Sequence, residues 1–367
     1  MSLNKIPTRQ LGRDGPHVSS IGLGCMGIGA WYGNTDKDAA YKALTYAADR
    51  GMTFWDTADV YGDSEQVIGK WFKETGRRSD IFLATKFGAF DPETQGLQGR
   101  LNPISSPSYI KRALARSLAR LGTSYIDLYY QHRVDPKVPI EIVLETLRPE
   151  VEKGAIRWVG LSECSAEVMR RARRVPGIGK RVVACQMEFS PFELVHEKDG
   201  FTKAAEEEGV AFVAYSPLAR GLISGRYRSR ADFDENDLRL LMPRFSEENF
   251  AKNLELVDKF KVVGEKYGAT PSQIVLAWIL AAYPNFIPIP GSRSADRVEE
   301  NARAAELMSE LKPEDISAIQ ALVEAADVHG ERMPETYLKA HNDECIPLEE
   351  WKGEESKEWG VGKEDKC

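Results

Sequence analysis

The sequence predicts a single (β/α)8, or TIM, barrel, an α/β fold in which eight parallel strands alternate with helices. Short apolar runs alternate with helical patterns along most of the 367 residues. The runs are rich in β-branched and aromatic residues and have no polar face, as expected of parallel strands buried on both sides. No linker rich in Pro, Gly or Ser divides the chain. We therefore expect one barrel over residues 1–328 and a charged tail over 329–367.

Each barrel element has its own segment. The expected strands cover 20–23, 53–56, 81–86, 126–131, 158–161, 182–186, 211–215 and 286–289. Helical periodicity lies between them, for example over 37–49, 107–121, 139–153 and 201–208.

Three additions to a minimal barrel are expected. Residues 7–19 contain a turn at Gly12 to Gly15 between two short β-like runs, which predicts an N-terminal β-hairpin before the first barrel strand. Residues 217–250 form a long polar loop after the seventh strand, and loops of that length are usually functional. From residue 329 the chain is charged and has few periodic apolar positions, so we expect the tail to be partly disordered.

Composition excludes several classes of protein. A formal net charge of −7 argues against a broad nucleic-acid surface. No window approaches the ~18 apolar residues of a membrane-spanning helix, and the first ten residues lack the apolar core of a signal peptide. The five cysteines are scattered, which disfavours a disulfide framework or a metal site. We expect a cytoplasmic protein with a small-molecule ligand and neither a nucleic-acid nor a membrane partner.

Four chemically complementary residues fall at the carboxyl ends of expected strands. They are Asp56, Tyr61, Lys86 and His132. Active sites of barrels lie at this end of the strands, so we expect the four side chains to meet. Together they suit proton delivery to a carbonyl group, with Tyr61 as the general acid and His132 as the hydrogen-bond donor that orients the carbonyl oxygen.

The proposed roles depend on charge. An ammonium on Lys86 would stabilise the phenolate of Tyr61 and pull its pKa downward, while Asp56 would keep a buried Lys86 charged. Two alternatives remain: the Asp56–Lys86 pair could brace the barrel with no catalytic role, or Lys86 could form a Schiff base, as in barrel aldolases.

A Gly-x-Gly-x-x-Gly spacing starts at Gly22, but it does not open a helix as a dinucleotide-binding fingerprint requires. We interpret it as the first strand–helix loop, where glycines let the backbone approach a ligand. Trp31 and Tyr32 in the same loop, together with Phe87, predict an aromatic substrate pocket.

A phosphate site is expected after the eighth strand. Ser292, Arg293 and Arg297 bring a hydroxyl and two guanidinium groups to the start of a helix. Read as a site for an adenosine 2′-phosphate, this segment favours NADP(H) over NAD. Taken alone, it would be an ordinary helix start with solvated charges.

These segments resemble the aldo-keto reductases over about residues 7–328. The shared segments are Asp-Thr-Ala-x-x-Tyr-Gly from Asp56, the strand-end Lys86 and His132, and Pro-Gly-Ser-Arg…Glu-Asn from Pro290. The resemblance implies carboxamide contacts at Ser162 and Gln186, stacking by Tyr215 and adenine contacts at Glu300 and Asn301. The cofactor contacts it implies are Met26, Ser162, Gln186, Tyr215, Ser216, Leu218, Arg220, Gly225, Arg226, Gly291, Ser292, Arg293, Arg297, Glu300 and Asn301.

The chain departs from the common family pattern at two positions. Glu163 stands where many members have Asn, and Gly291 stands where many have Lys. With Gly330 and Arg332, these features resemble the microbial and fungal branch that includes pyridoxal reductases and aryl-alcohol dehydrogenases. The resemblance implies NADPH-dependent, reversible reduction of an aldehyde or ketone. The alternative is an NADP-binding regulatory subunit similar to potassium-channel β subunits.

Overall fold

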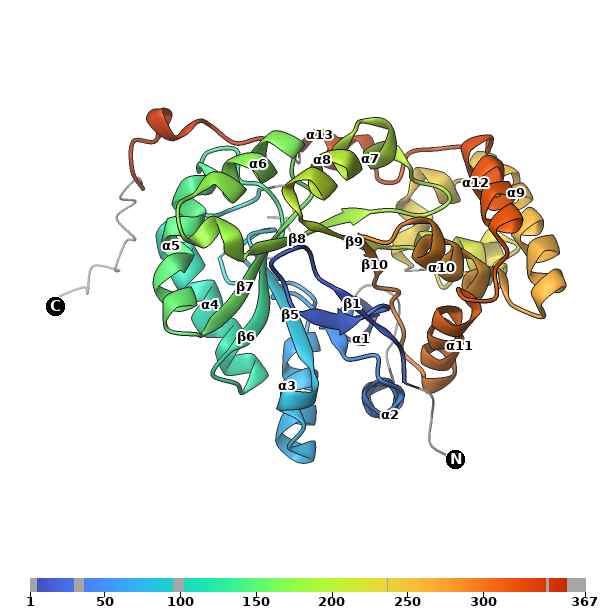
Figure 1. The fold of residues 1–367 in the computed structure, drawn as a ribbon, viewed down its shortest axis with the longest axis horizontal. Helices are drawn as coiled ribbons and strands as arrows, with labels where there is room; N and C mark the ends of the chain where they lie inside the picture. Colours follow the sequence, from blue (N-terminus) through green and yellow to red (C-terminus); the bar gives the residue numbers. More distant parts are fainter. Residues whose placement is uncertain (1–4, 30–35, 95–101, 236, 341–342, 355–367) are drawn as a thin grey trace, which may run out of the picture.

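Eight parallel strands close into a barrel with helices around it (Figure 1). The computed structural model describes residues 5–29, 36–94, 102–235, 237–340 and 343–354. Neighbouring strands pair in chain order from β3 to β10. The fold class predicted from the sequence is therefore confirmed. The strands are β3 (Leu23–Gly24), β4 (Phe54–Asp56), β5 (Phe82–Phe87), β6 (Ile126–Gln131), β7 (Ile156–Ser162), β8 (Val182–Glu188), β9 (Ala211–Tyr215) and β10 (Phe286–Pro288).

Several helices begin or end at recognisable capping residues. Thr270 and Gln273 form a reciprocal capping box at the start of α10, and Gly51 and Gly122 end α2 and α4 in the left-handed conformation. No helix in the described ranges is both long and apolar enough to cross a membrane. The helices are α1 (Met26–Gly29), α2 (Lys37–Arg50), α3 (Ser64–Thr75), α4 (Pro107–Leu121), α5 (Ile140–Glu152), α6 (Ala166–Arg174), α7 (Val195–Lys198), α8 (Phe201–Glu208), α9 (Glu247–Tyr267), α10 (Pro271–Ala282), α11 (Ala295–Leu307), α12 (Pro313–Glu324) and α13 (Glu335–Ala340).

The seam that closes the barrel explains two glycines of the Gly-x-Gly-x-x-Gly run. The backbone N–H of Gly22 donates to the carbonyl of Pro288 at 2.9 Å, and that of Gly24 donates to Pro290 at 3.0 Å. A Cβ atom on Gly24 would lie 2.8 Å from the carbonyl oxygen of Ile289, which is too close for any side chain. The run is thus part of the barrel wall and not the start of a dinucleotide-binding helix.

A hairpin covers the amino-terminal end of the barrel, as the turn signal predicted. Its strands β1 (Thr8–Gln10) and β2 (His17–Ser19) are antiparallel. Leu11 and Val18 are buried against residues of the barrel interior such as Val183. The hairpin therefore closes the end of the barrel opposite the carboxyl ends of the strands.

The loop after β9 is long, as predicted. It contains short 3₁₀ turns at Ala219–Ser224, Arg230–Asp232, Leu238–Leu241 and Pro243–Phe245 before α9 begins.

The tail differs from the expectation of a separate, partly disordered segment. The described tail residues, 329–340 and 343–354, form a C-terminal segment that packs on the barrel, and Figure 1 shows it in red passing from α12 across α7 and α8 towards α6. Arg171 of α6 donates to the carbonyls of Cys345 and Ile346, and the N–H of Ser165 donates to the carbonyl of Asp343 at 2.9 Å. Two of these contacts join a side chain to the backbone and the third joins two backbone groups, so charge composition gave no sign of them. Residues 355–367 lie outside the described residues.

Candidate active site

Two of the predicted side chains, Asp56 and Tyr61, meet around the fully buried ammonium of a third, Lys86. Asp56 and Lys86 lie at the ends of the adjacent strands β4 and β5. Lys86 Nζ forms an ion pair with Asp56 and donates to the carbonyl of Thr57 at 2.8 Å. The same atom lies 3.5 Å from the hydroxyl oxygen of Tyr61. An acid, an amine and a phenol are therefore in direct contact.

His132 completes the cluster from the end of β6. Its backbone N–H donates to the carbonyl of Phe87 at 2.7 Å, which fixes the chain as it leaves the strand. Its ring packs edge to face on Tyr61, with centroids 5.7 Å apart. The imidazole and the phenol thus face the same space.

Burial and charge compete at this cluster. Burial lowers the pKa of Lys86, but Asp56 and Tyr61 outweigh it, so the net pKa is raised and Lys86 remains an ammonium. This disfavours the Schiff-base alternative, which needs a neutral amine. Burial raises the pKa of Tyr61 more than Lys86 and Arg133 lower it. The downward pull of Lys86 on the pKa of Tyr61 is thus present as expected, but the net pKa is raised and the phenol keeps its proton at neutral pH.

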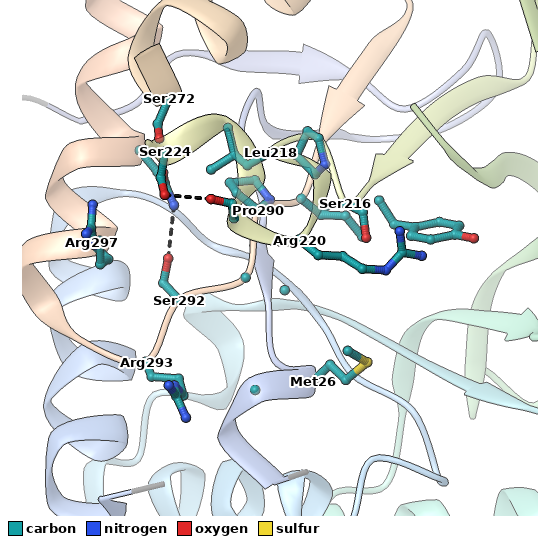
Figure 2. A pocket seen from close by; sticks show the side chains of 18 of the residues that line it. Met26, Ser216, Leu218, Arg220, Ser224, Ser272, Pro290, Ser292, Arg293 and Arg297 are labelled. Carbon is teal, nitrogen blue, oxygen red and sulfur yellow. Dashed lines mark hydrogen bonds between the residues drawn. The ribbon is translucent and has the colours of Figure 1, made fainter. Parts of the chain in front are cut away.

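A cavity of about 450 Å³ begins at this cluster and runs between the loop after β9 and the segment after β10. Gln186 lines it and donates to the second carboxylate oxygen of Asp56 at 2.7 Å, which ties the cavity to the buried ion pair. Figure 2 shows Ser292, Arg293 and Arg297 on one side of this space and Ser216 and Arg220 on the other.

Most of the predicted cofactor residues line this cavity. Ser162 and Gly225 do not, although Ser162 pairs in register with Gln186 on the neighbouring strand. The predicted residues in the lining are Met26, Gln186, Tyr215, Ser216, Leu218, Arg220, Arg226, Gly291, Ser292, Arg293, Arg297, Glu300 and Asn301. Lining residues that sequence reasoning missed include Ser224, Tyr227, Arg239, Ser272 and Ser294. Ser224, Tyr227 and Arg239 lie in the long loop, whose length was a signal but whose sequence has no period to single them out.

The end of the cavity at α11 is rich in hydrogen-bond donors. Asn301 donates to the hydroxyl of Ser292 at 2.9 Å and holds it near the start of the helix. Arg297 forms an ion pair with Glu300, which also accepts a hydrogen bond from Thr270 at 2.8 Å. Hydroxyl, guanidinium and helix amino-terminal groups have the chemistry that suits an anion such as phosphate.

The opposite wall contains strained backbone. Ser216, Ala219 and Arg220 have positive φ angles of 50°, 47° and 55°, a conformation that costs about 1–3 kcal/mol for each such residue. Two hydrogen bonds from Arg220 to the buried carboxylate of Glu188, at 2.6 and 2.9 Å, hold this turn. Such strain is typically retained where a loop binds a ligand.

Of the three predicted aromatic substrate contacts, Phe87 lies within the described residues. Phe87 is fully buried, packs against Tyr129 with centroids 4.9 Å apart and does not line the cavity. Successive side chains of a strand point to opposite faces, so Phe87 faces the helices while Lys86 faces inward. The prediction that Phe87 contacts substrate is therefore corrected. Trp31 and Tyr32 lie outside the described residues.

Glu163, one of the departures from the family pattern, turns towards the C-terminal segment. It adopts a positive φ of 51° and forms a 2.5 Å ion pair with Arg332. Burial raises the pKa of Glu163, but Arg332 and Arg133 lower it further, to about 2. Glu163 therefore stays charged over the whole physiological range.

This ion pair predicts a loss of stability in acid. The folded pKa of Glu163 lies below its unfolded value of about 4.3, so the stabilisation is complete above that pH and is lost as the pH falls towards 2. Glu163→Gln should lower the free energy of unfolding by about 2–3 kcal/mol at pH 7 and by about half as much at pH 3. Urea unfolding of both proteins at the two pH values measures this, and an equal difference at both would contradict a charged pair.

Comparisons with known proteins identify relatives of this chain. The family model described as "Aldo/keto reductase family" matches residues 20–324. Aldo-keto reductase str7 of Strobilurus tenacellus is 47% identical over 335 residues, which cover 89% of this chain and 95% of the relative. Aldo-keto reductase yakc [NADP(+)] of Schizosaccharomyces pombe is 46% identical over 334 residues, covering 90% and 95%.

Two solved structures of aldo-keto reductases are also similar to this chain. The aldo-keto reductase AKR11C1 of Bacillus halodurans, in its holo form, superposes with a TM-score of 0.70 at 29% identity, covering 89% of this chain and 99% of that one. The thermostable aldo-keto reductase Tm1743, in complex with the inhibitor epalrestat, gives a TM-score of 0.68 at 28% identity, covering 86% and 100%.

Proposed function

Because this chain belongs to the aldo/keto reductase family, we propose that it reduces an aldehyde or ketone to the alcohol with NADPH, in a reversible reaction. The observation that carries the proposal is the buried ammonium of Lys86, which contacts both Asp56 and the hydroxyl of Tyr61 at the end of a long cavity. A relative that is 46% identical carries NADP(+) in its name, which supports the choice of cofactor.

The lining of the cavity supports a dinucleotide with an additional phosphate as its ligand. Its volume of about 450 Å³ lies in the range of small-molecule sites. Ser292, Arg293 and Arg297 would hold the 2′-phosphate, and Gln186 and Tyr215 would hold the nicotinamide beside the buried lysine. When bound there, NADPH supplies the hydride. Between the 2′-phosphate and the nicotinamide, the cofactor would contact Met26, Ser216, Leu218, Arg220, Arg226 and Gly291. Glu300 and Asn301 would contact the adenine.

The residues of the cluster transfer one proton to the substrate and stabilise the phenolate that remains. Tyr61 is protonated at neutral pH and donates its proton to the carbonyl oxygen of the substrate. Lys86 stabilises the phenolate that remains, and Asp56 keeps Lys86 charged. His132, beside Tyr61, donates a hydrogen bond that orients the carbonyl oxygen. In the direction of alcohol oxidation, the phenolate of Tyr61 accepts the proton.

The test follows NADPH absorbance with 4-nitrobenzaldehyde and with pyridoxal, two carbonyl compounds suggested by the resembling branch, and repeats each assay with NADH. We expect carbonyl-dependent oxidation that is faster with NADPH. Tight NADPH binding without oxidation of any carbonyl would contradict the proposal and favour the regulatory-subunit alternative.

The assignment of the 2′-phosphate to Arg297 predicts an effect on NADPH binding that is absent for NADH. Arg297→Ala should weaken NADPH binding by about 10-fold or more, since hydrogen bonds to charged groups contribute about 1.5–3 kcal/mol, and should leave NADH binding nearly unchanged. Fluorescence titration measures both affinities. Arg303→Ala is the matched control, because Arg303 is exposed on the same helix and does not line the cavity. Equal weakening of NADPH and NADH would show that Arg297 does not recognise the 2′-phosphate.

A further inference from the structure

Tyr215 stands between two cavities. It lines the cavity of about 450 Å³ described above and also a second cavity of about 260 Å³ beneath the C-terminal segment. A side chain that borders cavities loses van der Waals contacts that would otherwise fix it. Tyr215 packs against the barrel interior on its remaining surface, so packing fixes this side chain only in part.

A hydrogen bond from the C-terminal segment also fixes the position of the Tyr215 side chain. Arg332 Nη1 donates to the hydroxyl oxygen of Tyr215 at 3.1 Å. The same guanidinium pairs with Glu163 at 2.5 Å and lies 3.4 Å from Glu188. Two carboxylates thus hold the guanidinium in place, and it in turn holds the phenol.

The carboxylate of Glu188 extends this link to the strained turn. Glu188 is fully buried and accepts two hydrogen bonds from Arg220, which lines the larger cavity. One guanidinium on the C-terminal segment is therefore connected to two residues of the cavity wall. Hydrogen-bonded networks of charged groups in a buried site hold their members in fixed positions.

The segment that carries Arg332 is itself anchored. The N–H of His329 donates to the side-chain oxygen of Asn253 at 2.9 Å, and Arg244 donates to the carbonyl of Gly330 at 3.2 Å. Gly330 has a φ of +84°, and a Cβ atom there would lie 2.7 Å from the backbone of Pro243. The chain thus enters this region along a fixed path.

We propose that Arg332 is a positioning residue of the cofactor site: it fixes the ring of Tyr215 for contact with the nicotinamide and, through Glu188, fixes Arg220. The proposal rests on the proposed function in that it requires a nicotinamide cofactor in the larger cavity. It makes the C-terminal segment part of the binding site, although that segment lies beyond the last barrel strand.

The test measures the dissociation constants of NADPH and NADH by fluorescence titration of the full-length protein. Arg332→Met should raise both constants by about 10-fold, the equivalent of about 1.4 kcal/mol. The two should rise by the same factor, since Arg332 acts at the nicotinamide end and not at the 2′-phosphate. Tyr215→Phe should raise them by a smaller factor, and the double variant should be no weaker than Arg332→Met alone, because the same hydrogen bond cannot be lost twice.

Arg171→Met is the matched control. Arg171 also holds the C-terminal segment, through the carbonyls of Cys345 and Ile346, but it touches neither Tyr215 nor the larger cavity. We expect wild-type affinity for both cofactors in this variant. If Arg171→Met weakened cofactor binding as much as Arg332→Met does, Arg332 would act only as an anchor of the C-terminal segment, and the proposal would be overturned.

Other outcomes are equally decisive. Wild-type affinity in a folded Arg332→Met protein, or additive effects of the two single changes, would overturn the proposal. If Arg332→Met does not fold, Tyr215→Phe alone decides, since it removes one hydroxyl and leaves the ion pairs intact; unchanged affinity would again overturn it. Failure of the wild-type protein to bind NADPH would instead overturn the proposed function.

Discussion

Tyr61→Phe should lower the turnover of carbonyl reduction by at least about 100-fold, the usual loss when general acid catalysis is removed. The phenylalanine ring keeps the edge-to-face contact with His132 but has no proton to give. The affinity for NADPH should be nearly unchanged, so the loss should appear in kcat. Steady-state kinetics together with a fluorescence titration separate the two quantities.

A matched control removes a phenol elsewhere. The hydroxyl of Tyr267 contacts Asp315, between α9 and α12, and Tyr267 does not line the cavity. Tyr267→Phe should keep wild-type turnover. Near-wild-type turnover in Tyr61→Phe would instead mean that another group, or water, supplies the proton.

Lys86→Met should both abolish most of the turnover and destabilise the protein. The methionine cannot stabilise the phenolate of Tyr61, and it leaves the carboxylate of Asp56 buried without its ion pair. Removing one partner of a buried ion pair costs about 3–5 kcal/mol. Urea unfolding measures the loss of stability, and the NADPH assay measures the loss of turnover.

The double variant Lys86→Met/Asp56→Asn separates these two effects. Neutralising Asp56 removes the uncompensated charge, so much of the stability should return while turnover stays low. If the double variant were as unstable as the single one, the two side chains would not form an energetically coupled pair. If turnover returned, the ammonium would not be needed for catalysis.

The bounds of strands and helices were predictable where the pattern of apolar residues in the sequence is strong. The strands at 126–131 and 211–215 and the helices at 107–121 and 201–208 have the predicted bounds. The strands β7 and β8 extend beyond the predicted limits, because their ends are defined by pairing with neighbours and not by apolar content. The docking of the C-terminal segment was not predictable, since it depends on arginine side chains that reach backbone carbonyls.

The meeting of Asp56, Tyr61 and Lys86 was predictable because the carboxyl ends of parallel strands converge. The net direction of the pKa shift at Tyr61 depends on how completely the phenol is buried, which the sequence does not encode locally. The error at Phe87 was avoidable: strand alternation places it opposite Lys86. The contact between Arg332 and Tyr215 joins distant parts of the chain and carries no local signal.

The barrel seam has a consequence for how the protein is made. Gly24 on one side of the seam, and Ile289, Pro290 and Gly291 on the other, line the larger cavity, so the two edges that close the barrel are also two walls of the cavity. During synthesis the ribosome must release nearly the whole barrel before this cavity can exist. A dinucleotide that bridges both edges binds only the closed barrel, so it shifts the folding equilibrium by mass action. The concentration of the cofactor would then affect the folding stability of the chain as well as its activity.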